Sequence, residues 1–527
     1  MRKKWIWVIL AAVLLAMLAA CAPYDKLRER FTPSSPGPET AKPIDSAAVA
    51  NTVAVGMYDF DTFNPLTTQS QTVREAMEFV YEPLFSLNEQ VQPEPVLAKD
   101  YGMSADGKTA VINLREDVQW HDGTQFSAYD AAYTIRMIRE GKTTYTEQLS
   151  EVADWNVTGD YQITVRFNHP VPSAGALFCF PIMKYGTNME EKDTYVPIGT
   201  GPFAFSGKIS TDRYMLNAFD YYYGGKAKID GVYIDKIPDA EHYIYMCSSG
   251  AVDISTSKTI DLRTYTPKGS VVLNEYVSDR MLFLGINNQK QELAGVNTRK
   301  ALSQMIDKDK IISSILYSRA EKADVPINPS FWLYDNSAVA GDGISAEDHL
   351  KVDGWTAADN GGYEKNIGGQ KQVLSLELLV NGDNEEKKVI AKAVADDLTR
   401  YGVKTRVTEL PYEQYTARIE SKQYDLFLGE TEIRPTQDVY SLLNGGGNLF
   451  GYKSDTADTL LAQIGMTSDT EDLKTLYTQL ANTFSEEVPF VPISFAKECM
   501  MSNPKLKDIK CPGVSGFYRM PGEWRMK

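Results

Sequence analysis

Residues 373–380 read VLSLELLV, which has the length and the apolar content of a buried strand. Residues 385–401 follow with apolar side chains at helical spacing along one face, and Gly402 ends that pattern. Residues 403–407, VKTRV, return to the pattern of a strand. A strand, a helix and a second strand in this order form a βαβ unit. This half of the chain is therefore predicted to hold an α/β sheet.

A second group of predicted elements lies nearer the N-terminus. Residues 109–115 (TAVINLR) and 161–167 (YQITVRF) are short runs rich in β-branched and aromatic side chains, which predicts two strands. Between them, Ser127 and Asp130 have the spacing of a capping box, and apolar residues follow at helical spacing. A helix is expected over residues 128–140.

Two glycine-rich stretches match nucleotide-binding patterns, but the residues around them do not fit that chemistry. Residues 102–109 (GMSADGKT) match a phosphate loop, yet the next residues alternate like a strand, whereas a phosphate loop leads into a helix. We interpret this stretch as a hairpin turn with Asp106 and Gly107 at its tip. Residues 199–204 (GTGPFA) fit a dinucleotide fingerprint, but Pro202 leads into a β-like stretch. No cofactor is expected.

Composition and motif content argue against catalysis and against nucleic-acid binding. The chain has 4 histidines, and the sequence contains neither a serine nucleophile elbow nor a His-Glu-x-x-His zinc motif. His121 and Asp122 are adjacent and do not converge from one strand, so we interpret them as a structural turn before Gly123. With 70 acidic and 54 basic residues, the chain repels nucleic acid. We expect no enzyme and no metal centre.

The N-terminal residues have the pattern of an export signal. Arg2, Lys3 and Lys4 precede an apolar run at residues 5–20, which is shorter than the roughly 18 to 20 residues of a spanning helix. The run ends in Leu-Ala-Ala-Cys, which resembles the lipobox of bacterial lipoproteins. Removal of residues 1–20 would leave an acylated Cys21, and the proline-rich residues 21–50 are expected to form a disordered tether.

The remaining cysteines leave two alternatives open. Cys179, Cys247, Cys499 and Cys511 lack the two-residue spacing of metal and redox motifs. Export permits a disulfide, and Cys499 with Cys511 would close a hairpin. Free thiols are the equally weighted alternative.

A series of segments, in order, is similar to one family of proteins. In the longest, residues 95–135, a leucine-alanine stretch, a turn, a strand and a His-Asp-Gly-Thr turn precede a capped helix. The other matching segments are residues 62–66 (TFNPL), 81–85 (YEPLF), 199–203 (GTGPF), 223–225 (YGG), 229–230 (ID), 284–287 (LGIN), 296–307 (VNTRKALSQMID) and 488–492 (VPFVP). Together they resemble the extracellular solute-binding proteins of the oligopeptide, dipeptide and nickel transport group, which serve ABC transporters.

The resemblance implies an α/β fold with the two lobes of periplasmic binding proteins (type II, cluster C) and a small domain inserted in the first lobe. Lobe I is expected at residues 51–63, 199–280 and 490–527, the inserted subdomain at 64–198, and lobe II at 281–489. Such proteins close on a solute held between the lobes. The implied function is capture of an oligopeptide or dipeptide for an ABC permease, by a monomer anchored by lipid at the extracytoplasmic face of the cell membrane.

The resemblance also points to one ligand contact. In peptide-binding relatives an aspartate of the second lobe pairs with the amino group of the ligand, and residues 429–443 (GETEIRPTQDVYSLL) match that segment. Glu432 then takes the acidic position, and Arg434 lies two residues on. Arg434 either binds a ligand carboxylate or neutralises Glu432, and in the second case amine binding fails. An exposed loop acid is the alternative interpretation of Glu432.

Further ligand contacts are predicted in loops at the edge of the cleft, with ordinary core packing as the alternative for the aromatic residues. They are Tyr58, Phe60, Phe331, Trp332, Tyr440 and Asn448. Other cargoes that suit the same fold are a metal chelate, a sugar oligomer or another cation. A ligand sensor without transport and a secreted hydrolase are the alternative functions.

Overall fold

The computed structural model describes residues 51–527, except 142, 189–194, 257–270, 336–340, 360, 445–446, 511–512, 514–515 and 517. The predicted signal, Cys21 and the tether lie outside the described residues, and so does Cys511. The pairing of Cys499 with Cys511 therefore stays a prediction. Within the described part of the chain, no helix is long and apolar enough to cross a membrane.

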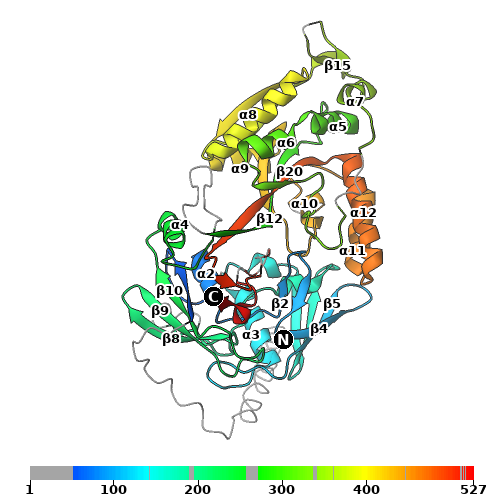
Figure 1. Ribbon diagram of the computed structural model, residues 1–527. Helices are drawn as coiled ribbons and strands as arrows, with labels where there is room; N and C mark the ends of the chain where they lie inside the picture. The colour runs from blue at the N-terminus through cyan, green and yellow to red at the C-terminus, as the bar shows by residue number, and fades with distance from the viewer. Residues whose placement is uncertain are drawn as a thin grey trace, which may run out of the picture.

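One large sheet of 11 strands runs through the molecule from end to end (Figure 1). Ten strands follow each other across it, and β13 (Ala320–Lys322) pairs with β20 beside that path. The order is β18 (Lys404–Leu410), β17 (Ser375–Asn381), β19 (Leu426–Glu432), β12 (Val272–Ile286), β20 (Phe490–Ser502), β11 (Ile254–Thr256), β1 (Thr52–Met57), β10 (Gly231–Lys236), β9 (Arg213–Ala218) and β8 (Phe203–Ser210).

Two long central strands connect the two ends of this sheet. β12 has 15 residues and β20 has 13, and they pair antiparallel with a register shift between Val277 and Met281. Residues 500–502, at the end of β20, also pair with β11. Residues 280–286, at the end of β12, also pair with β19. The predicted boundaries between the lobes, at residues 280/281 and 489/490, fall within β12 and at the start of β20. The domain boundaries stay a proposal.

The predicted βαβ unit is present in lobe II. β17 and β18 pair in parallel, and α8 (Glu385–Arg400) connects them. The next helix, α9 (Tyr412–Glu420), leads from β18 to β19. Residues of α8 share a core with Leu378, whereas residues of α9 share a different core with Leu379. Because successive strand residues point to opposite faces, α8 and α9 cover opposite faces of the sheet.

The inserted subdomain holds its own four-stranded antiparallel sheet. Its order is β4 (Ala98–Met103), β5 (Thr109–Leu114), β7 (Gln162–Phe167) and β6 (Val152–Gly159). α3 (Ala128–Glu140) covers it and begins with the predicted capping box, in which the Ser127 N–H donates to the Asp130 carboxylate at 2.8 Å. Residues 104–108 join β4 to β5, with Gly107 at φ 66°. The hairpin interpretation of the phosphate-loop match is confirmed.

The remaining elements are short or lie at the periphery. The helices are α2 (Gln71–Met77), α4 (Ala240–Ser249), α5 (Val296–Met305), α6 (Lys308–Lys310), α7 (Ala346–Val352), α10 (Tyr440–Leu443), α11 (Asp455–Met466) and α12 (Thr470–Glu487), with turns η1 (Glu147–Leu149), η2 (Ala174–Phe178), η3 (Ile311–Ile315) and η5 (Pro521–Glu523). The strands are β2 (Phe85–Leu87), β3 (Pro93–Pro95), β14 (Thr356–Ala357), β15 (Tyr363–Ile367), β16 (Gln370–Val373), β21 (Leu506–Lys507) and β22 (Arg525–Met526).

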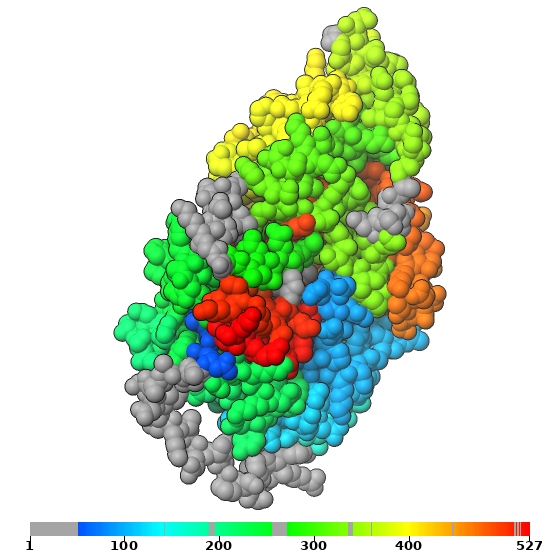
Figure 2. All heavy atoms as spheres, viewed as in Figure 1, coloured from blue at the N-terminus to red at the C-terminus, as the bar shows by residue number. Residues whose placement is uncertain are grey.

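The inserted subdomain packs against lobe II. Figure 2 shows its blue surface against the orange helices α11 and α12, and the backbone of Gly107 in the β4–β5 turn closely approaches Gly465 of α11. Leu87 and Ala176 of the subdomain belong to the same buried cluster as the lobe II residues. The backbone N–H of Trp332 also donates to the Gln90 carbonyl at 2.9 Å. The subdomain is therefore in contact with lobe II as well as with lobe I.

His121 connects two of the matching motifs. Its Nδ1 accepts a hydrogen bond from the Gly199 N–H at 3.2 Å, and its Nε2 donates to the Gly201 carbonyl at 2.9 Å. Burial lowers the pKa of His121 to about 4, so the ring is neutral near pH 7. The ring therefore ties the His-Asp-Gly-Thr turn to the Gly-Thr-Gly-Pro turn, which confirms the structural interpretation of His121. Within the described residues no group of three His, Cys, Asp or Glu side chains has metal-binding geometry.

Glu82, in the YEPLF segment, is buried among hydroxyl donors. Its carboxylate accepts hydrogen bonds from the hydroxyls of Tyr222 at 2.7 Å, Tyr223 at 2.9 Å and Thr200 at 3.0 Å. Burial raises the pKa of Glu82 to about 7, and these hydrogen bonds oppose the rise without cancelling it. The folded protein therefore holds this proton more tightly than the unfolded chain does.

The Glu82→Gln variant is expected to change how stability depends on pH. In the wild type, the contribution of Glu82 to the free energy of unfolding is fully present below about pH 4.5 and is lost as the pH rises through about 7. Glutamine stays neutral, so the free energy of unfolding of the variant rises by about 3 kcal/mol relative to that of the wild type across this pH range. Urea unfolding at a series of pH values measures the difference. Parallel stability curves for the two proteins would contradict the assignment.

Candidate ligand-binding site

A cavity opens in lobe II where two parallel strands separate. β17 and β19 pair only at Leu378–Leu426 and Leu379–Phe427, so residues 428–432 of β19 have no strand on that edge among the described residues. The chain passes from β17 to β18 on one side and returns to β19 on the other, which makes this a topological switch point. Ligands in open α/β sheets bind at such points, outside the carboxyl ends of the strands. The cavity has a volume of about 500 Å³, within the usual range for small-molecule sites.

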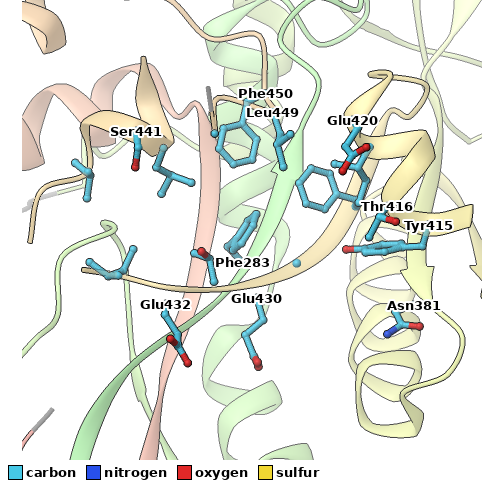
Figure 3. A pocket seen from close by; sticks show the side chains of 18 of the residues that line it. Phe283, Asn381, Tyr415, Thr416, Glu420, Glu430, Glu432, Ser441, Leu449 and Phe450 are labelled. Carbon is cyan, nitrogen blue, oxygen red and sulfur yellow. The ribbon is translucent and has the colours of Figure 1, made fainter. Parts of the chain in front are cut away.

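One wall of the cavity is aromatic. The Phe283 ring meets the rings of Phe427 and Phe450 edge to face, with centroids 5.6 and 5.8 Å apart. Phe427 and Phe450 stack nearly parallel at 6.0 Å. Figure 3 shows Phe283, Leu449 and Phe450 on one side of β19, with Tyr415 and Asn381 farther along the strand. Each of these three phenylalanine rings is at most 4% exposed, so they belong to the lobe II core beneath the cavity.

The rim of the cavity is acidic. Glu430 and Glu432 leave β19 on the side away from Phe283, Leu449 and Phe450 (Figure 3). The Glu430 carboxylate lies 3.8 Å from the Lys387 ammonium group and 3.8 Å from the Arg280 guanidinium group. Glu432 is exposed, and the ion pairs among the described residues do not include it. Although Arg280 lies opposite Glu432 in the strand pairing, its guanidinium is 3.5 Å from Glu498 and 3.8 Å from Glu430.

Arg434 lines the same cavity, but its charge is paired with the inserted subdomain. Its Nη1 donates to the Glu151 carboxylate at 2.7 Å, and its Nη2 donates to the Ser150 hydroxyl at 3.3 Å. The alternative in which Arg434 neutralises Glu432 is therefore not the arrangement that the structure contains. The objection to amine binding that rested on this pairing does not apply.

The other six predicted contacts do not line this cavity. Phe331 is 1% exposed and packs edge to face on Tyr477 at 5.1 Å, and Trp332 is half-buried against the same core. The other four lie elsewhere: Tyr58 and Phe60 pack on cores of lobe I, Tyr440 lies beside the His169 ring, and the Asn448 side chain donates to the Tyr452 carbonyl. Their role as ligand contacts stays a prediction.

Several cavity residues carried no recognisable signal in the sequence. Tyr412, Tyr415 and Thr416 come from α9, and Asn381 and Lys387 come from the end of β17 and the start of α8. Each lies in an ordinary strand or helix pattern. The signal that was present is topological: parallel strands joined by helices on both faces place such residues at the carboxyl edge of the sheet.

Comparison with known proteins agrees with this architecture. The family profile of bacterial extracellular solute-binding proteins, family 5, matches residues 92–453, more than half of the chain. The chain belongs to this family. It is also 22% identical to the oligopeptide-binding protein AppA of Bacillus subtilis (strain 168), an alignment that covers 88% of this chain and 90% of AppA. The nickel-binding periplasmic protein of Escherichia coli (strain K12) is 25% identical, with 85% and 89% covered.

The solved structures similar to this family 5 protein support the predicted two-lobed fold. The unliganded open form of the periplasmic murein tripeptide-binding protein MppA superposes with a TM-score of 0.77 at 17% identity, covering 91% of this chain and 98% of MppA. The predicted fold class is confirmed. The nickel-binding relative and MppA are named as periplasmic proteins and the family is described as extracellular; this chain is a solute-binding protein of that family.

Proposed function

We propose that this family 5 protein captures a peptide with a free amino terminus and passes it to an ABC permease. The peptide main chain would pair with residues 429–432 of β19, and its terminal ammonium group would pair with Glu432. The observation that carries the proposal is the position of Glu432, an exposed carboxylate outside the ion pairs of the described residues, at the end of a strand with an open edge.

The open edge of β19 suits an extended peptide better than a compact solute. Strand addition uses backbone N–H and C=O groups that every peptide has, so it binds the main chain irrespective of sequence. The Tyr415 hydroxyl already donates to the Leu428 carbonyl at 2.7 Å, which leaves residues 429–432 to face the cavity.

Lipid anchorage at Cys21 is the second part of the proposal. The Leu-Ala-Ala-Cys sequence supports acylation of Cys21, and residues 22–50 would tether a monomeric body at the extracytoplasmic face of the cell membrane. Anchoring raises the local concentration of the protein near its permease. No bond in the ligand is broken in this proposal.

A metal chelate is the second candidate cargo, because one relative that aligns with 85% of this chain is named a nickel-binding protein. An acidic rim would attract a cationic complex by the same charge that attracts an ammonium group. The two cargoes differ in the role of the β19 edge, which only a peptide main chain would use.

Competitive capture separates the two cargoes. The full chain in detergent is freed of ligand by mild unfolding and refolding, and is then offered synthetic peptides of mixed length together with nickel bound to histidine. After gel filtration, mass spectrometry identifies peptides and metal analysis quantifies nickel in the protein fraction. Retained peptides support the proposal. Retention of nickel without peptide contradicts it.

A further inference from the structure

Glu151 of the inserted subdomain holds two cations at the edge of the ligand cavity. His169 Nε2 donates to its Oε2 at 2.6 Å, and Arg434 Nη1 donates to its Oε1 at 2.7 Å. The Glu151 side chain is 19% exposed and the Arg434 side chain 29%, so the contact is largely shielded from water. Glu151 precedes β6 and His169 follows β7, whereas Arg434 follows β19 of lobe II.

The protonation states of this cluster follow from its geometry. His169 Nδ1 donates to the Pro170 carbonyl at 2.9 Å while Nε2 donates to Glu151, so both ring nitrogens face acceptors and the ring is an imidazolium. The hydrogen bond to Glu151 raises the pKa of His169 to about 9, and the His169 and Arg434 contacts lower the pKa of Glu151 to about 2. Glu151 is therefore charged across the physiological range.

Two other acidic residues near Arg434 in the sequence line the same cavity. Glu432 lies two residues before it, and Asp438 lies four residues after it. A guanidinium that paired with Glu432 would compete directly with a ligand ammonium group, because both cations would use the same carboxylate. The Glu151 contact removes Arg434 from this competition, with Ser150 as a further acceptor.

We propose that Glu151 is a positioning residue that sets the charge preference of the ligand site. By binding Arg434, the inserted subdomain leaves Glu432 available for a cationic amino terminus, although Glu151 itself does not contact the ligand. Without Glu151, the Arg434 guanidinium turns to Glu432, and the site no longer favours a free amine over a blocked one. This inference rests on the proposed peptide function.

The test measures selectivity instead of affinity alone. Synthetic peptides of mixed length and without lysine are mixed in equal amounts with N-acetylated copies and offered to the full chain in detergent. Mass spectrometry then gives the ratio of free to acetylated peptide in the bound fraction. Wild type is expected to favour the free amine, and Glu151→Gln is expected to lower that ratio about tenfold. Glu147→Gln, an exposed change of the same kind in η1, serves as the matched control and keeps the wild-type ratio.

A double variant separates charge selection from simple contact between the subdomain and lobe II. The variant that carries both Glu151→Gln and Arg434→Gln also lacks the competing cation. Its preference for the free amine is expected to return to that of the wild type. If Glu151→Gln weakens both peptide forms equally, or if the double variant does not restore the ratio, Glu151 has only a structural role and the inference is overturned. Equal binding of both forms by wild type would instead contradict the proposed function itself.

Discussion

Replacing Glu432 with glutamine is expected to weaken the binding of a peptide with a free amino terminus by about 30-fold or more, the effect of removing one partner of a charge pair that becomes enclosed when the lobes close on the ligand. Glu432 stands at the end of β19, outside the ion pairs of the described residues, so a ligand ammonium group would meet its full charge. Glutamine keeps the size of the side chain and one acceptor oxygen, but it removes the charge-assisted hydrogen bond. Isothermal titration calorimetry with a single captured peptide measures the loss.

The N-acetylated copy of that peptide supplies the second arm of a double-mutant cycle. Acetylation of the peptide is expected to weaken its binding to the wild type about as much as the Glu432→Gln substitution weakens binding of the free peptide. In Glu432→Gln, acetylation should weaken binding little further, because both changes remove the same charge pair. Glu413→Gln makes the same charge change at an exposed position of α9 that does not line the cavity, and it should bind as wild type does. Additive losses from acetylation and substitution would mean that the amino terminus pairs elsewhere.

Replacing Gly199 with alanine is expected to destabilise the fold by about 3 kcal/mol, at the upper end for an overpacked site. A Cβ at this position would lie 1.8 Å from the Val80 carbonyl oxygen and 2.5 Å from its carbon. These are backbone atoms, so no side-chain rotation relieves the clash. The Gly199 N–H also donates to His121, and the Gly201 N–H donates to the same Val80 carbonyl. Displacement of the Gly199 backbone would therefore disturb the contact between the His-Asp-Gly-Thr turn and the Gly-Thr-Gly-Pro turn.

The matched control for Gly199→Ala is Gly102→Ala. Gly102 is an exposed position in β4 where an added Cβ meets no atom within 4 Å. Its substitution should leave the midpoint of urea unfolding within experimental error of wild type, whereas Gly199→Ala lowers it. Equal midpoints for the two variants would show that the approach of Val80 to Gly199 is not a constraint on the fold.

Local patterns in the sequence predicted the local elements of the structure. The period-3.6 face of residues 385–401 and the flanking apolar runs predicted β17, α8 and β18, because each signal lies within a single segment. The capping box at Ser127 and Asp130 placed the start of α3 correctly for the same reason. The hairpin at Gly107 followed from the alternation of the strand after it.

Contacts between distant segments could not be predicted from those patterns. β12 and β20 pair Val272 with Ser502, and nothing in either strand specifies a partner so far along the chain. Arg434 and Glu151 are separated by 283 positions, and so the sequence left open whether Arg434 neutralises Glu432. Phe331 has the composition of a pocket aromatic residue, and its near-complete burial follows from packing on α12, which only the assembled fold defines.

The most direct test of the proposed peptide function is to identify what the protein holds when no ligand is added. The full chain, purified in detergent without added ligand, is denatured, and the released compounds are analysed by mass spectrometry and metal analysis. The proposal predicts peptides whose amino termini are free, because Glu432 requires an ammonium partner. Release of a metal chelate or a sugar without any peptide, or of peptides that are uniformly blocked at the amino terminus, would contradict it.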